Sequence, residues 1–314
     1  MSASNHMYEN LVFEGGGVKG SAYAGCIQVM AGRHLFDHVK RVAGTSAGSI
    51  TAALLAVGAG SPGLTDSILH SNFKKFVADW GWVFGDIYRL FTRYGIHTGN
   101  SFEKILQNDI YKYNPREEAK NKDLTFGQLA ELIKKHPTIY KDLTVVASNI
   151  TKQRKEVFNS INTPDIPIWK AVRCSMSIPF VFEPYHLNGD YYMDGGLGDI
   201  YPIDIFDEKG PDGDDIRNPK TLGFYLEPQN EINNPHFIPP DTNIHSVKSA
   251  AGAMFDFLFN SANSKYIHPD DKARTVFIDD LGISATDFGI KEKDIKRLIA
   301  SGKEATEDFL SDGD

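Results

Sequence analysis

The chain has few cysteines. Only Cys26 and Cys174 occur among its 314 residues. They are far apart in the sequence and each lies among apolar neighbours, so we expect two buried free thiols and no disulfide framework. Unpaired thiols are typical of a reducing compartment, which favours the cytoplasm.

The sequence also lacks a long apolar segment and an excess of basic residues. Its longest apolar stretch, residues 50–59, is too short to cross a bilayer, so we expect any membrane contact to be peripheral and transient. A net charge of −8 argues against a general nucleic-acid-binding protein, which needs clustered Lys and Arg for the phosphates. Residues 1–7 are polar and show no signal-peptide pattern. We interpret them as a disordered N-terminus or a remnant of cloning.

Glycine, in contrast, is plentiful, and the first glycine-rich segment is Glu14-Gly15-Gly16-Gly17-Val18-Lys19-Gly20. The apolar run at 11–13 before it predicts a buried strand, and a helical pattern follows it. Bare backbone N–H groups at a helix start are electropositive and suit an oxyanion. A tight structural turn and a phosphate site for a nucleotide are the alternatives. The positions of the glycines and of Lys19 match neither GxGxxG nor a P-loop. The pattern therefore favours an oxyanion site over a nucleotide site.

The second segment, Gly44-Thr45-Ser46-Ala47-Gly48, has the GxSxG pattern of a nucleophile elbow. A strand is predicted before it at 41–43 and a helix after it at 47–57. Small residues let the chain turn sharply and expose a serine, although Ser46 as a simple helix cap is the alternative. A right-handed crossover would return this strand beside the first one, so both segments should meet at one edge of a parallel sheet.

The third segment, Asp194-Gly195-Gly196, follows an apolar strand at 191–193 and supplies a carboxylate. A serine hydroxyl needs a base to take its proton, and we expect Asp194 to be that base. The common alternative meaning of DGG is a glycine turn capped by its aspartate. If Asp194 is not the base, His236, His245 and His268 are the next candidates.

Together these segments resemble the patatin-like phospholipases, whose GGGxK/RG loop, GxSxG elbow and DGG or DGA turn occur here in the family's order and spacing. Residues 174–180, CSMSIPF, resemble the small-residue stretch before the family's aspartate. The resemblance covers roughly residues 8–230. It implies an α/β fold, a three-layer α/β/α sandwich with a mainly parallel central sheet, and it implies neither a metal nor a cofactor. The site residues that it implies are a Ser46 and Asp194 dyad and an oxyanion hole from the amides of Gly15, Gly16, Gly17 and Val18.

We expect residues 8–314 to form a single domain with an aromatic-rich helical insert at about 61–118. Most of its aromatic residues should pack as core, and the part around Trp80-Gly81-Trp82 is our candidate for a lid. Lys19 has two interpretations, contact with a phospholipid head group or simple solvation at a helix start. Further strands are predicted at 143–148, 154–158, 221–226 and 275–278, with a closing helix at 290–309.

The function implied is a calcium-independent lipid acyl hydrolase that cleaves carboxylic esters of phospholipids or lysophospholipids at a membrane surface, with or without an unknown activator. An acyltransferase of the Ser-His type is one alternative. A catalytically silent lipid-binding module is the other, and the complete set of Ser46, Asp194 and glycines argues against it.

Overall fold

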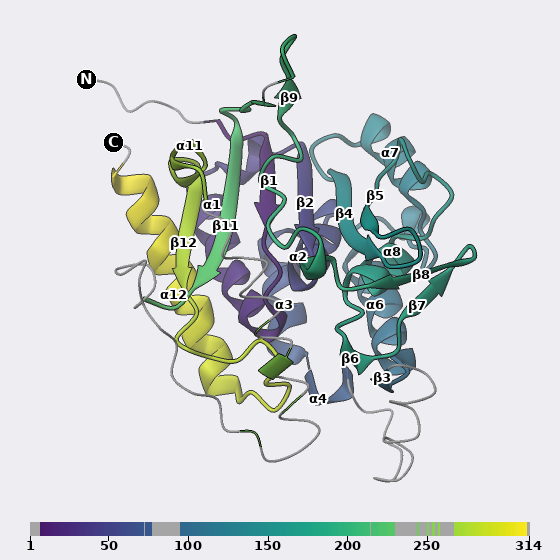
Figure 1. Ribbon diagram of the computed structural model, residues 1–314. Helices are drawn as coiled ribbons and strands as arrows, with labels where there is room; N and C mark the ends of the chain where they lie inside the picture. Colours follow the sequence, from purple (N-terminus) through teal and green to yellow (C-terminus); the bar gives the residue numbers. More distant parts are fainter. Residues whose placement is uncertain are drawn as a thin grey trace.

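The computed structural model describes residues 7–71, 73–76, 95–213, 215–229 and 267–312, together with isolated positions between 244 and 257. A mixed eight-stranded sheet forms its centre, in the order β12-β11-β1-β2-β4-β8-β7 with β5 on β4 (Figure 1). The parallel strands are β1 (Asn10–Phe13), β2 (Arg41–Thr45), β4 (Asp142–Asn149), β11 (Thr221–Glu227) and β12 (Thr275–Asp279). The antiparallel strands are β5 (Arg154–Phe158), β7 (Tyr185–Leu187) and β8 (Asp190–Met193).

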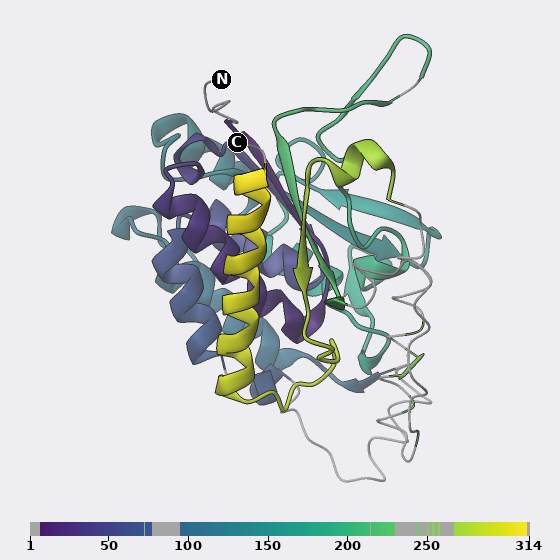
Figure 2. The ribbon, with the colours of Figure 1, turned by 90° about the vertical axis from the view of Figure 1, so that its left-hand side faces the viewer.

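The long helices gather on one face of this sheet (Figure 2). They are α1 (Tyr23–Gly32), α2 (Ala47–Ala56), α3 (Gly60–His70), α6 (Asn100–Tyr113), α7 (Phe126–Lys135), α8 (Ile168–Ser175) and α12 (Glu292–Asp312). Short helical turns complete the described chain: η1 (Gly17–Ala22), η2 (Phe36–His38), α4 (Phe73–Phe76), η3 (Glu117–Ala119), η4 (Gly195–Leu197) and α11 (Pro269–Lys272). Two small ribbons pair β3 (Gly95–His97) with β6 (Phe180–Phe182) and β9 (Glu208–Lys209) with β10 (Asp215–Ile216).

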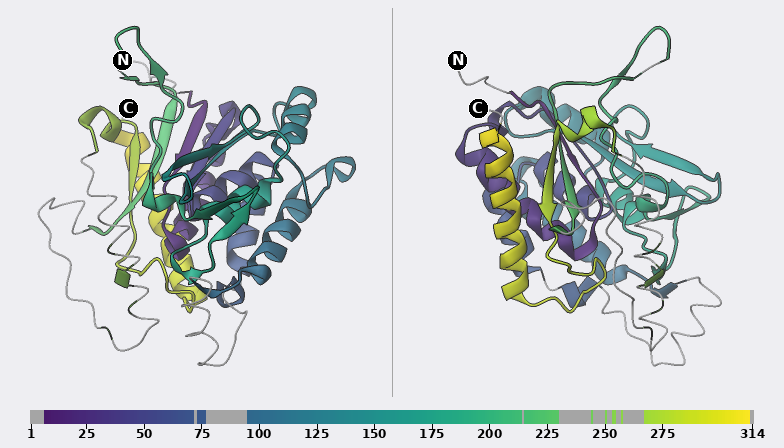
Figure 3. Two further views of the ribbon diagram at one scale, coloured as in Figure 1. Left: turned by 45° about the vertical axis from the view of Figure 1, so that its right-hand side comes forward. Right: turned by 60° about the vertical axis from the view of Figure 1, so that its left-hand side comes forward.

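The opposite face of the sheet has a thinner cover. Alternate residues of a strand point to opposite faces, so Leu11 and Phe13 face the long helices while Val12 faces away. Val12 packs against Ile203 and Phe206, which belong to the irregular connection from η4 to β9. The short helix α11 lies on this side too, as Figures 2 and 3 show. The three-layer sandwich with a mainly parallel sheet is therefore confirmed. The layer on the face opposite the long helices consists mostly of loops.

The strands expected from the sequence are all present, and the crossover places β2 parallel to β1 as predicted. The helix after the glycine loop differs in one respect, because it begins as the 3-10 turn η1 before α1. Cys26 and Cys174 are both buried and unpaired, which confirms the expectation of free thiols. Within the described ranges, no helix combines the length and the apolarity that a bilayer span requires.

The described residues of the insert at about 61–118 form the helices α3, α4 and α6, the turn η3 and the short strand β3. Helix α3 packs on α1 and α2, and α6 packs on α2 and α8, so these parts of the insert belong to the main core. The candidate lid at Trp80-Gly81-Trp82 lies outside the described residues, and so do residues 1–6.

Candidate active site

Ser46 occupies a sharp turn between β2 and α2. Its backbone has φ 51° and ψ −126°, a left-handed conformation that side chains rarely adopt. The flanking glycines make room for this turn. A Cβ on Gly44 would lie 2.4 Å from the carbonyl carbon of Gly48, and a Cβ on Gly48 would lie 2.3 Å from the carbonyl oxygen of Phe13. The GxSxG segment therefore has the strained geometry of a nucleophile elbow.

The sheet brings Asp194 to this turn from the other half of the chain. Strand β8 runs antiparallel to β4 with Met193 opposite Ser148, so its next residue lies at the end of the sheet where β2 also ends. The hydroxyl of Ser46 donates a hydrogen bond of 2.6 Å to Oδ2 of Asp194, and the N–H of Gly196 donates one of 2.8 Å to Oδ1. Serine and aspartate are both completely buried.

Burial changes the acidity of this carboxyl. It disfavours the charged form and raises the pKa of Asp194 to about 7, while the hydrogen bonds from Ser46 and Gly196 act in the opposite direction. A carboxylate with an ordinary pKa near 4 is a weak base toward a hydroxyl. The raised pKa makes Asp194 a stronger base, and it leaves the carboxyl about half ionised at neutral pH.

The glycine loop lies beside Ser46, but fewer of its amides are free than we expected. The N–H of Gly15 donates to the carbonyl of Ile200 and the N–H of Val18 donates to that of Ala285, each at 3.0 Å. For Gly16 and Gly17, no acceptor is found among the described residues. Gly17 has φ +55°, and a Cβ there would lie 2.0 Å from the carbonyl oxygen of Ala285. The candidate oxyanion donors are therefore the N–H groups of Gly16 and Gly17.

Glu14 anchors the start of this loop to the sheet. Its side chain is completely buried, and Oε2 accepts a hydrogen bond of 2.6 Å from the N–H of Leu226 in β11. The hydroxyl of Tyr23 donates to the Glu14 carbonyl at 2.7 Å. Burial raises the pKa of Glu14 well above its ordinary value, which favours a neutral carboxyl in this position.

Lys19 does not match either interpretation of the sequence. Its ammonium group forms an ion pair with Asp280, whose side chain is fully buried, and only 15% of the lysine side chain is exposed. Asp280 also accepts the N–H of Gly282 at 2.9 Å. The lysine is thus neither solvated nor free for a lipid head group, and it ties η1 to the loop after β12.

We expect Lys19→Met to lower the free energy of unfolding by about 3 kcal/mol, because it leaves the Asp280 carboxylate buried without its cation. Urea unfolding measures the change. The double variant Lys19→Met/Asp280→Asn is the control and should recover part of the loss. If Lys19→Met keeps its stability but selectively loses activity on anionic lipids, the result would instead support contact of Lys19 with a phospholipid head group.

Three residues of the 174–180 stretch support the site, although no sequence pattern predicts a role for any of them. The N–H of Ser46 donates to Oγ of Ser175 at 2.8 Å, and this hydroxyl donates to the carbonyl of Val146 at 2.6 Å. Sδ of Met176 lies 3.3 Å from Oγ of Ser46. The carbonyl of Ser177 accepts the N–H of Asp194 at 2.9 Å. The run of small residues was the only signal in the sequence for this support.

The alternative bases are not brought to Ser46 in the described part of the chain. His268 caps α11, which precedes β12 and therefore lies at the opposite end of the parallel strands from Ser46. His236 and His245 lie outside the described residues. Across the described ranges, no three His, Cys, Asp or Glu side chains are grouped as metal ligands.

Solved structures with this fold include two bacterial proteins. VipD from Legionella pneumophila is 20% identical with a TM-score of 0.57, and the match covers 98% of this chain and 67% of that one. The type III effector ExoU of Pseudomonas aeruginosa is 18% identical with a TM-score of 0.51, over 98% of this chain and 53% of that one. At these identities the similarity concerns the fold alone.

Curated relatives are closer in sequence. Uncharacterized protein R571 of Acanthamoeba polyphaga mimivirus is 30% identical over 73% of this chain and 68% of its own length. Uncharacterized protein YqhO of Bacillus subtilis is 29% identical over 97% of this chain and 98% of its own length. Probable lipid hydrolase 463L of Invertebrate iridescent virus 6 is 28% identical over 63% of each chain. The family model described as patatin-like phospholipase matches residues 11–207, which include Ser46, Asp194 and the glycine loop. The chain therefore belongs to the patatin-like phospholipase family.

Proposed function

We propose that this protein hydrolyses carboxylic esters of phospholipids or lysophospholipids through a covalent acyl-enzyme on Ser46, with Asp194 as the base. The observation that carries the proposal is the hydrogen bond of 2.6 Å between Oγ of Ser46 and Oδ2 of Asp194 inside a fully buried site. Membership of a lipid hydrolase family supplies the class of substrate.

The proposed reaction has two similar halves. In the first, the Ser46 proton moves to Asp194 while Oγ bonds to the ester carbonyl carbon, and the C–O bond to the alcohol then breaks as the alcohol takes that proton. In the second, Asp194 takes a proton from water, the resulting oxygen attacks the acyl-enzyme, and the fatty acid leaves as Ser46 regains its proton. Atoms and charge balance without any other reactant.

The amides of Gly16 and Gly17 are the proposed donors to the oxyanion in both halves. Their N–H groups belong to a loop held at both ends, since Gly15 donates to Ile200 and Val18 donates to Ala285. Donors fixed in advance need no reorganisation when charge develops, and one such donor typically contributes roughly 2.7–4 kcal/mol to the transition state.

Access to the site requires a movement of the groups that cover it, because Ser46 and Asp194 have no exposed surface. We propose that the protein works from the cytoplasm and opens on transient contact with a membrane surface or with an activator. A Ser-His acyltransferase is the weaker alternative, since the hydroxyl of Ser46 donates to a carboxylate rather than to a histidine. A silent lipid-binding module would not need a strained serine paired with an aspartate.

We expect the purified protein to release fatty acid and lysophospholipid from a defined mixed-chain phosphatidylcholine, and to do so equally well in EDTA, because neither half of the reaction uses a metal. Mass spectrometry of the products measures both the activity and the position of the cleaved ester. The Ser46→Ala variant is the control for contaminating lipases. Activity that disappears in EDTA and returns with calcium would contradict the metal-free mechanism.

A further inference from the structure

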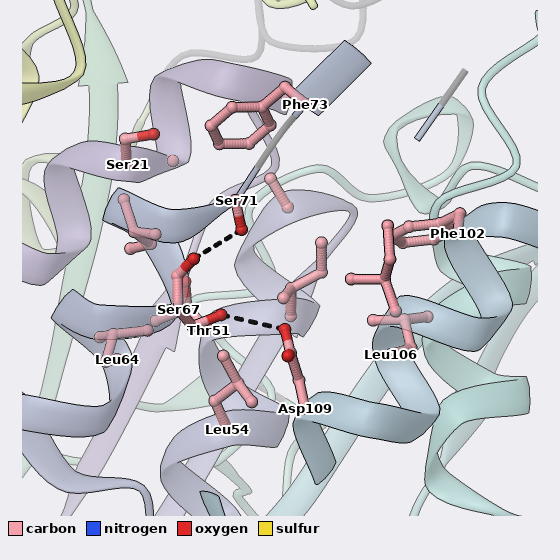
Figure 4. A pocket seen from close by; sticks show the side chains of 16 residues that line it. Ser21, Thr51, Leu54, Leu64, Ser67, Ser71, Phe73, Phe102, Leu106 and Asp109 are labelled. Carbon is pink, nitrogen blue, oxygen red and sulfur yellow. Dashed lines mark hydrogen bonds between the residues drawn. The ribbon is translucent and has the colours of Figure 1, made fainter. Parts of the chain in front are cut away.

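Two hollows in the described part of the chain differ greatly in size. The smaller lies between α2, α3 and α6, and its volume is about 50 Å³. Its polar groups already bond to one another, since the hydroxyl of Ser67 donates to Oδ2 of Asp109 at 3.0 Å (Figure 4). The larger is a groove of about 700 Å³ between β12 and α12, at the edge of the sheet. Of the two, the groove has room for part of another molecule.

One side of the groove is the outer edge of the sheet. Strand β12 pairs with β11 and is the last strand of the sheet in this direction. The N–H of Asp280 donates to the carbonyl of Glu227 in β11. Because alternate residues of a parallel strand bond to the same neighbour, the backbone groups of Thr275, Phe277 and Asp279 point away from β11. These three residues of β12 line the groove.

Phe277 offers the most accessible part of this edge. Thr275 is buried, whereas Phe277 and Asp279 are half-buried. The carbonyl of Asp279 accepts a hydrogen bond of 2.7 Å from the hydroxyl of Ser301 in α12. Among the described residues, no group bonds to the N–H or the carbonyl of Phe277, or to the N–H of Asp279. Unpaired backbone groups in a row form a template on which an extended chain can add a strand.

The side chains around the groove are mostly acidic where they are charged. Glu304 and Asp308 of α12 are exposed, and Asp279 lies on the β12 side. Arg297 is the one cationic residue in the lining, and it pairs with Asp294 at 3.0 Å. The groove is therefore negatively charged, which favours an occupant with Lys or Arg side chains.

The two faces of the sheet differ at this edge. Helix α12 lies on the face where the long helices gather (Figure 2), so one set of side chains from an added strand would meet Glu304 and Asp308. The other set would meet Phe277, whose ring packs edge-on against Tyr225 with 5.7 Å between the ring centroids. Successive side chains of a strand point to opposite faces. A segment in which basic and apolar residues alternate therefore suits both faces.

We propose that this groove binds an extended basic segment of a partner protein, which adds to β12 as a further strand. The backbone of Phe277 pairs with the segment, and the Lys or Arg side chains of the segment face Glu304 and Asp308. A second copy of this chain is a poorer occupant, because a two-fold contact would bring the same carboxylates together. The proposal does not depend on ester hydrolysis, since Ser46 follows β2, three strands away from β12.

Fluorescence anisotropy with a labelled peptide of alternating lysine and valine, KVKVKVK, tests the charge part of the proposal. We expect saturable binding that weakens between about 50 mM and about 500 mM NaCl, and no binding of EVEVEVE. Glu304→Lys/Asp308→Lys should weaken KVKVKVK binding at least about tenfold. Glu292→Lys/Glu307→Lys is the matched control, with the same change of net charge on exposed positions of α12 outside the groove, and should bind like the wild-type protein.

The variant Phe277→Pro tests the strand pairing. Proline has no N–H to offer the peptide, and an edge strand tolerates it where the N–H points away from the sheet. We expect at least about tenfold weaker binding of KVKVKVK, whereas Phe277→Val keeps the N–H and should retain most of the binding. Hydrogen exchange measured by mass spectrometry on the wild-type protein gives a second readout, because the peptide should slow amide exchange in residues 275–281.

Three results would overturn the proposal. The first is equal binding of KVKVKVK by both double variants of α12, which would show a non-specific charge effect. The second is protection from exchange outside residues 275–281 alone, which would place the peptide on another surface. The third is a dimer of the free protein that Phe277→Pro separates, detected by analytical ultracentrifugation, which would make a second copy of the chain the occupant of the groove.

Discussion

Ester hydrolysis by Ser46→Ala and by Asp194→Asn should each fall by at least about a thousandfold in kcat/KM, which is a typical loss when a nucleophile or its base is removed. Without Oγ of Ser46 no acyl-enzyme forms. An asparagine in place of Asp194 still accepts the Ser46 hydrogen bond but cannot take the proton. Initial rates on a p-nitrophenyl ester measure the loss.

The two residues should behave as one unit. If Asp194 acts only by activating Ser46, the double variant Ser46→Ala/Asp194→Asn is no slower than Ser46→Ala alone, because the second change removes a function that has already gone. Additive losses would show that the aspartate acts on another group. This comparison tests the dyad itself, which loss of activity in a single variant does not.

Matched controls are available for both positions. Asp190→Asn changes an aspartate at the start of β8, the strand that ends directly before Asp194, where it pairs with Lys152. Ser301→Ala removes a hydroxyl on α12 that donates to a backbone carbonyl. Both controls should retain activity. Near-full turnover by Asp194→Asn would contradict the dyad and would direct attention to His236 and His245.

The local features of this fold could be predicted from the sequence because they depend on neighbouring residues. The apolar run of β1 and the helical pattern of α2 each lie within one short window, and so does the turn at Ser46, whose glycines relieve contacts within and beside the turn. The prediction that Asp194 meets Ser46 spans 148 residues. It came from the resemblance and from the three segments taken together, because no local pattern shows which carboxylate the sheet brings to a serine.

The features that were missed depend on contacts between distant segments. The sequence predicts a lipid head group or solvent as the surroundings of Lys19, because its partner Asp280 lies 261 residues away. The glycine-rich pattern predicts free amides at Gly15 and Val18, although both donate to backbone carbonyls of two later loops. Ser175, which accepts the N–H of Ser46, is one small residue in a run of several. A loop sequence shows which groups are exposed along the chain but not which of them later segments will cover.

Catalysis and stability should depend on pH in opposite directions, and Asp194 is the reason. The reaction needs its carboxylate, so with a pKa of about 7 the rate should rise with pH up to neutrality and level off above it. Folding favours the protonated form, because the carboxyl has a higher pKa when buried than in the unfolded chain. The stabilisation of the folded protein by this protonated carboxyl is complete below the pKa of Asp194 in the unfolded chain. It is lost as the pH rises through the pKa of Asp194 in the folded protein.

The contribution of Asp194 to the pH dependence of stability can be measured with Asp194→Asn, whose side chain does not titrate. Between about pH 5.5 and about pH 8.5, the wild-type protein should lose about 2 kcal/mol of unfolding free energy relative to the variant, because each pH unit below the folded pKa contributes about 1.4 kcal/mol. Urea unfolding of both proteins at the two pH values gives the difference. At the higher pH the inactive variant should be the more stable protein, since it buries no charge.

An equal response of the two proteins to pH would show that Asp194 titrates near its ordinary pKa. In that case burial would not have strengthened it as a base, and the proton of Ser46 would need another acceptor.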